Sequence, residues 1–118
     1  MKNRSFHERL MFALNGLSTA WLRESSFRTQ TALAVFAVVI LVVMRPPIVW
    51  WAIVALTVSF VLATELMNSA FEALVDHLHP ERHPEIRVIK DMAAGGVLLA
   101  STGALLIGLL LLITTLWP

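Results

Sequence analysis

Four polar side chains follow an apolar run in the middle of the chain: Glu65, Asn68, Glu72 and Asp76. A helix turns about 100° per residue, so this spacing places all four within an arc of about 80° on one helix face. Glu65 closely follows the apolar run 48–63, at or inside the boundary of a membrane. An ionisable group at that depth is costly to bury, which makes it a functional candidate, and a carboxylate there can serve as a general base.

Other residues near the same boundary can complete a site. Carboxylates on one helix face can hold Mg²⁺, a hard cation that often binds through one or two carboxylates and the phosphates of a substrate. Glu24 opens the first apolar segment at this interface, so it can complete a metal site with Glu72. Lys90 and Asp91 begin the last apolar segment at the same level, where a lysine can meet a phosphate as a point charge.

Several charged residues have a simpler explanation as anchors that extend toward the membrane surface: Arg23, Arg28, Asp76 and Arg87. The histidines of the polar stretch 77–85 could indicate zinc, but two prolines break this stretch, and a solvated loop explains it better. The chain has only five glycines and lacks the G-x-x-x-x-G-K-[ST] phosphate loop, so any use of ATP must rely on other residues.

The elements that position these residues are three apolar segments after an amphipathic start. Apolar side chains in the first segment of the chain recur at helical spacing: Phe6, Leu10, Leu14, Leu17 and Trp21. They predict a helix over about 5–24, either lying in the membrane interface or packed on the rest of the protein. Membrane spans are expected over about 28–45, 48–76 and 91–117. The Pro46-Pro47 pair predicts a tight reversal, which makes the first two spans antiparallel neighbours.

Composition supports an all-α integral-membrane protein with a single domain over 1–118. The chain of 118 residues is 58% hydrophobic and only 14% charged, whereas soluble domains carry about 25% charged residues. Its formal charge of +1 is too small for a nucleic-acid binder. The absence of cysteine excludes disulfides and thiolate metal sites. The polar start predicts no cleavable signal peptide.

The distribution of basic residues predicts the orientation in the membrane. Eight lysines and arginines lie before the first span or between the second and third, and Arg45 alone lies in the opposite turn. Positively charged loops stay in the cytoplasm. The N-terminus and the 77–90 segment are therefore expected on the cytoplasmic side of the membrane.

The polar motifs resemble those of a known family. The stretch E-L-M-N-S-A-F-E-A-L-V-D at 65–76, followed by K-D-M-A-A-G at 90–95, is similar to the signature of the prokaryotic diacylglycerol kinase family, which are small integral-membrane lipid kinases. The stretch E-S-S-F-R at 24–28 is similar to the family's E-x-x-F-R segment. The resemblance extends from about Phe12 to Trp117.

The resemblance implies a surface helix, three transmembrane helices and a homotrimer with active sites shared between subunits. It implies transfer of the γ-phosphate of MgATP to a lipid hydroxyl, with Glu65 as general base and with Glu24 and Glu72 as metal ligands. The residues that it implies around the nucleotide are Asn68, Glu81, His83, Lys90 and Asp91. Diacylglycerol is the expected acceptor. The protein itself is expected to contact the surrounding membrane lipids.

The sequence departs from the Gram-negative pattern at Ala13, at Gln30 and in the run 93–96. An arginine expected near the N-terminus has no secure match either, because Arg4 and Arg9 are both out of register. The H-P-E stretch at 83–85 and A-A-G at 93–95 are closer to the undecaprenol kinase branch, so undecaprenol is the alternative acceptor. Two other classes remain open. A small proton-coupled transporter could use Glu65 alone, and the small residues at 93–96 are compatible with a structural assembly subunit.

Overall fold

The computed structural model describes residues 3–117; residues 1–2 and 118, the ends of the domain expected over 1–118, lie outside the described part. Four helices follow one another: α1 (Phe6–Arg23), α2 (Ser25–Met44), α3 (Ile48–Leu78) and α4 (Pro84–Leu116). The last three are each long and apolar enough to cross a membrane. The expectation of an all-helical protein with three such helices is confirmed.

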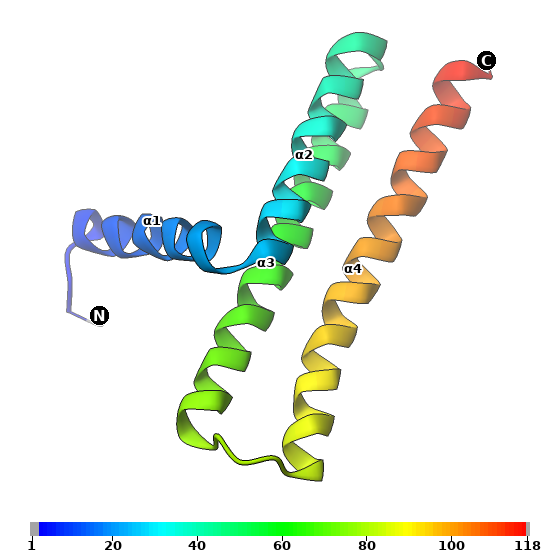
Figure 1. The fold of residues 1–118 in the computed structure, drawn as a ribbon. Helices are drawn as coiled ribbons and strands as arrows, with labels where there is room; N and C mark the ends of the chain where they lie inside the picture. The colour runs from blue at the N-terminus through cyan, green and yellow to red at the C-terminus, as the bar shows by residue number, and fades with distance from the viewer. Residues whose placement is uncertain (1–2, 118) are drawn as a thin grey trace.

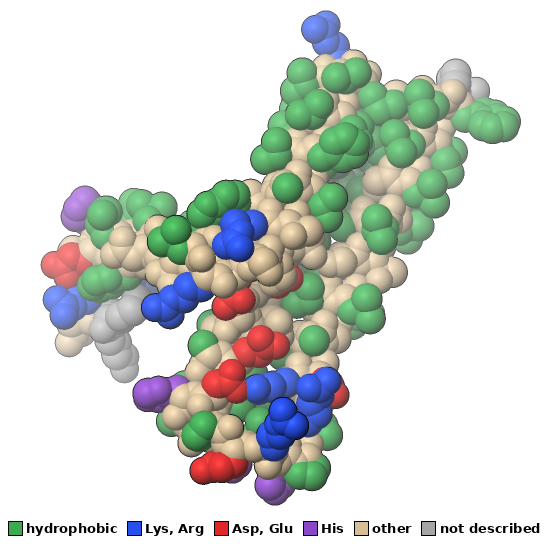
Figure 2. Space-filling model, viewed as in Figure 1, with side chains coloured by type: hydrophobic (Ala, Val, Ile, Leu, Met, Phe, Trp, Pro, Cys, Tyr) green, Lys and Arg blue, Asp and Glu red, His purple; other side chains and the backbone are tan. Residues whose placement is uncertain are grey.

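The three apolar helices run alongside one another, and α1 projects away from them to one side (Figure 1). Helix α3 contacts both α2 and α4, with its more extensive contact to α4. The α2–α3 turn and the C-terminus lie at one end of the molecule, and the α3–α4 loop lies at the other (Figure 1). Charged side chains gather near that loop and along α1, whereas the opposite half is mainly hydrophobic (Figure 2).

The reversal between α2 and α3 spans only residues 45–47, as the proline pair predicts. Arg45 ends α2 in the left-handed region at φ 49° and ψ 54°, and its backbone N–H donates to the Leu41 carbonyl. Pro47 then precedes the first residue of α3. The two helices are antiparallel neighbours, as expected.

The junction between α1 and α2 is a single extended residue, Glu24. The Arg28 side chain folds back over it and donates to the backbone carbonyls of Trp21, at 2.6 Å, and Leu22, at 3.4 Å. These carbonyls end α1 without partners inside their own helix. Arg28 therefore stabilises the corner between α1 and α2, a role that its sequence position did not reveal.

Helix α3 extends to Leu78 and α4 begins at Pro84, so the polar loop is shorter than the expected 77–85. Proline is well suited to the first turn of a helix because its missing N–H would have no partner there. The His83 ring accepts a hydrogen bond from the Glu85 backbone N–H at 3.1 Å, which caps the start of α4.

The buried core lies near the proline turn. Its largest cluster of contacting buried residues is Leu41, Val54 and Leu111, one residue from each long helix. By contrast, the apolar side chains predicted to line one face of α1 are all exposed in the single chain. The glycines at 95 and 96 have open space beside them. Within residues 3–117, no other helix closely approaches Gly95 or Gly96.

Candidate active site

The four polar residues Glu65, Asn68, Glu72 and Asp76 all lie on α3, and together they are called the polar face. This face runs continuously from the apolar bundle toward the α3–α4 loop. Glu65 is buried, with 4% of its surface exposed, among neighbours that are mostly apolar along α3. Within residues 3–117, the structure gives its carboxylate no hydrogen-bond or ion-pair partner, although buried charges are normally paired. An ionisable side chain in such a position is a candidate for chemistry.

Asn68 and Glu72 continue this face toward the loop. Both side chains are half-buried. The Asn68 side-chain oxygen is buried and accepts no hydrogen bond from the described residues. Glu72 lies seven residues after Glu65, which corresponds to about 10 Å along the helix axis and nearly the same angular position. The face thus presents three oxygen-bearing side chains in a row.

Glu24 stands at the corner between α1 and α2, and its backbone rather than its side chain caps both helices. Helix α1, which ends at this corner, also contacts α3. Among the described residues, no three acidic or histidine side chains are grouped closely enough to hold a metal ion by themselves. The chain alone therefore offers carboxylates to a metal but not a closed cage.

An ion pair joins the last apolar helix to the polar face: the Lys90 ammonium group donates to the Asp76 carboxylate. Lys90 is the less exposed partner, with 29% of its side chain accessible compared with 60% for Asp76. Asp76 follows Glu72 by one helical turn on the same face. The pair thus brings Lys90 to the end of the polar face. Asp76, which the sequence analysis explained most simply as an anchor, is the partner of Lys90.

Asp91 is directed to a different partner, Arg87, at 3.2 Å, and both side chains are largely exposed. Glu81 lies in the loop, where its carboxylate is 3.6 Å from the His79 ring. Both Glu81 and the capping residue His83 line a cavity of about 560 Å³ together with Asp76 and Lys90.

The single chain does not bring every predicted residue together. From Glu65 to the end of α3 the helix rises about 20 Å, so Glu81 and His83 lie well beyond the expected base. Lys90, through its ion pair with Asp76, lies between Glu65 and the loop residues Glu81 and His83. A ligand that contacts both Glu65 and these loop residues within this chain must extend along α3, past the Asp76–Lys90 pair.

Comparison with known proteins identifies the family. The sequence profile described as "Prokaryotic diacylglycerol kinase" matches residues 11–112. The chain is 33% identical over 90 residues to a diacylglycerol kinase of Helicobacter pylori, which covers 76% of this chain and 70% of the relative. It is also 33% identical over 89 residues to a diacylglycerol kinase of Escherichia coli, covering 75% and 73% of the two chains.

A third relative bears another name. An undecaprenol kinase of Bacillus subtilis is 28% identical over 106 residues, covering 90% of this chain and 86% of the relative. Taken together, these matches show that the chain belongs to the prokaryotic diacylglycerol kinase family. It is therefore an integral-membrane enzyme of the lipid kinase class, whose chemistry is ATP-dependent phosphoryl transfer. The resemblance inferred from the sequence is confirmed, and nothing supports the transporter alternative.

Proposed function

We propose that this protein transfers the γ-phosphate of ATP to the hydroxyl of diacylglycerol, which yields phosphatidic acid and ADP. The observation that carries this proposal is the buried side chain of Glu65, in line with Asn68 and Glu72 on α3 of a lipid kinase. Phosphoryl transfer depends mainly on positioning and on neutralising charge. A base at the apolar end of a polar face, with a lysine near the other end, provides that arrangement.

In the proposed reaction, the Glu65 carboxylate accepts the proton of the lipid hydroxyl. The hydroxyl oxygen then forms its bond to the γ-phosphorus, and the bond from that phosphorus to the β–γ bridging oxygen breaks. ADP leaves with that oxygen. A general base contributes about 10²–10⁴-fold to such a step when it lies within hydrogen-bond reach.

Glu24 and Glu72 are proposed to hold Mg²⁺, whose chemistry when bound is to neutralise phosphate charge. The carboxylate oxygens of Glu24 and Glu72 are donors of a kind that suits Mg²⁺. Magnesium prefers oxygen ligands and commonly takes only one or two carboxylates together with phosphates. The unpartnered oxygen of Asn68 adds a neutral oxygen donor to the same face, and Asn68 is proposed to support the site.

Lys90 and Asp91 are proposed to contact the nucleotide, together with Glu81 and His83 in the loop. The location of Lys90 at the end of the polar face supports its role, because an ammonium group there can bind phosphate. Asp91 and Glu81 are acceptors that can receive hydrogen bonds from nucleotide hydroxyl or amino groups.

We further propose that the protein is a homotrimer with active sites shared between subunits in the bacterial inner membrane. The exposed apolar surface of the single chain and the unfilled space beside Gly95 and Gly96 support close packing with other copies. The basic residues of the N-terminal segment and of the 77–90 segment support a cytoplasmic position for both. Native mass spectrometry in detergent tests the trimer.

Undecaprenol is the second candidate acceptor, favoured by the match to the Bacillus subtilis undecaprenol kinase over 90% of the chain. The deciding experiment is transfer from γ-labelled ATP with purified protein in mixed micelles, offered each lipid separately, with and without Mg²⁺. Label in diacylglycerol that requires Mg²⁺ is the expected result. Label in undecaprenol alone would replace the acceptor, and label in neither lipid from folded protein would refute the proposed reaction.

A further inference from the structure

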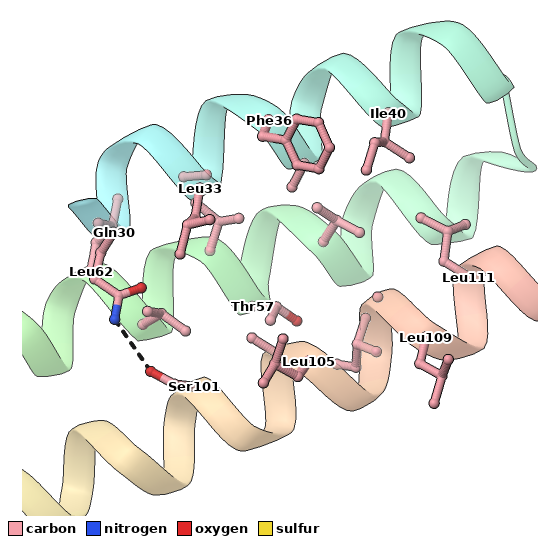
Figure 3. A pocket seen from close by; sticks show the side chains of 18 of the residues that line it. Gln30, Leu33, Phe36, Ile40, Thr57, Leu62, Ser101, Leu105, Leu109 and Leu111 are labelled. Carbon is pink, nitrogen blue, oxygen red and sulfur yellow. Dashed lines mark hydrogen bonds between the residues drawn. The ribbon is translucent and has the colours of Figure 1, made fainter. Parts of the chain in front are cut away.

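A groove of about 460 Å³ lies between the three apolar helices. Its walls are almost entirely hydrocarbon, with residues of α2 such as Leu33, Phe36 and Ile40 facing residues of α4 such as Leu105 and Leu109 (Figure 3). Along α2 the groove extends from Gln30 to Ile40, which corresponds to about 15 Å of helix. Its size and lining suit a hydrocarbon chain.

One end of this groove is polar. The Gln30 side-chain amide donates to the Ser101 hydroxyl at 3.4 Å, which joins α2 to α4 across 71 residues of sequence (Figure 3). The remaining hydroxyl in the groove, that of Thr57, donates to the Ile53 carbonyl of its own helix at 2.7 Å. Gln30 and Ser101 are thus the groove residues whose polar groups are directed across it.

This polar end adjoins the proposed base. Leu62 lies at the same end as Gln30 and Ser101 (Figure 3), and Val61 also lines the groove. Glu65 follows Val61 by four residues, so it lies on the same face of α3, about 6 Å further along the axis. The buried side chain of Glu65 therefore lies about one helical turn beyond the polar end of the groove.

We propose that Gln30 and Ser101 select diacylglycerol as the acceptor by binding one of its ester carbonyls, while a chain of the lipid occupies the groove and its hydroxyl reaches Glu65. This inference rests on the proposed function. The Gln30 amide has a second N–H that its bond to Ser101 does not use, and the serine hydroxyl can donate to a carbonyl oxygen. Diacylglycerol offers ester carbonyls close to its hydroxyl, whereas undecaprenol offers only hydrocarbon there.

Selection by such a pair follows from general principles. A hydrocarbon groove distinguishes poorly between two apolar chains. A polar pair built to bind a substrate group discriminates against an analogue without that group, because the pair's own polar atoms are then left less well satisfied.

The test compares kcat/KM for diacylglycerol and undecaprenol in the same micelles, for the wild type, Gln30→Met and Ser101→Ala. Each variant is expected to lower the diacylglycerol value about tenfold, the effect of losing one well-placed hydrogen bond. The undecaprenol value is expected to stay within about twofold, since that lipid makes no such bond. Thr57→Val is the matched control, because its hydroxyl serves its own helix, and it should leave the ratio of the two values unchanged.

Equal losses for both lipids would overturn the inference and show that the pair only holds α2 against α4 or against a second copy. Detergent thermal stability and native mass identify that case. Folded variants that keep the wild-type ratio of the two kcat/KM values would also overturn the inference, although the proposed kinase activity would stand. A wild type that labels only undecaprenol would overturn the selection of diacylglycerol. A wild type that labels neither lipid would refute the proposed function itself.

Discussion

Replacing Glu65 by glutamine tests the proposed base most directly. The two side chains have nearly the same shape, so Glu65→Gln preserves the packing of a residue that is only 4% exposed. The amide cannot accept the proton of the lipid hydroxyl. We expect kcat to fall about 10²–10⁴-fold, the usual contribution of a general base, with the KM values for ATP and lipid changed far less.

The structure also predicts the sign of the stability change. The Glu65 side chain is 4% exposed and forms no hydrogen bond or ion pair with residues 3–117, so the substitution removes no such contact. Removal of the charge should leave the thermal midpoint in detergent equal to the wild type or higher. A loss of activity caused by misfolding would instead lower this midpoint.

The assay measures γ-labelled phosphate in the extracted lipid, with the thermal midpoint and the native mass recorded for each sample. Glu85→Gln is the matched control, since Glu85 is an exposed carboxylate in the first turn of α4 and lies outside the proposed machinery. It should keep wild-type turnover. Turnover above about a tenth of the wild type in folded, correctly assembled Glu65→Gln would refute the reasoning, because a proton acceptor contributes more than that.

Three further predictions concern Glu72, Lys90 and Leu41. Glu72→Gln should raise the Mg²⁺ concentration for half-maximal activity, with part of the rate recovered at high Mg²⁺; a titration that matches the wild type would contradict its role as a ligand. Lys90→Met should raise the KM for ATP about tenfold, the effect of losing a charged hydrogen bond, whereas Asp76→Asn keeps the ammonium group and should change that KM by less. Leu41→Ala removes a core side chain that is 2% exposed and should lower the free energy of unfolding by about 2–3 kcal/mol, measured as a lower thermal midpoint with turnover retained in the cold.

The helices themselves could be predicted because they depend on local signals. Apolar runs of spanning length and the Pro46-Pro47 pair determine where α2 and α3 meet. The predicted ends of the helices were less accurate at the α3–α4 loop and at the junction between α1 and α2. Pro84 could be taken as a helix breaker, yet it occupies the first turn of α4, where a proline is favourable. The single-residue junction at Glu24 depends on Arg28 reaching back to α1, a contact that periodicity does not encode.

The candidate site could be predicted only along one helix. The spacing of Glu65, Asn68 and Glu72 determines their common face because all three share α3. The partners that come from other helices could not be inferred from spacing. Lys90 meets Asp76 only because the loop returns α4 alongside α3. Gln30 of α2 meets Ser101 of α4, although 71 residues separate them in the sequence.

The length of α3 links the two environments that this chemistry requires. A base works best away from water, where its charge is costly, whereas phosphates and their counter-ions need polar surroundings. One unbroken helix of 31 residues holds Glu65 in the apolar bundle and Asp76 near the loop at a fixed separation of about 16 Å. Because α3 remains helical throughout, the four polar residues keep a common face. A break between 65 and 76 would rotate the carboxylates away from one another while leaving every residue type in place. The continuity of α3 is therefore as much a requirement of the proposed site as the carboxylates themselves.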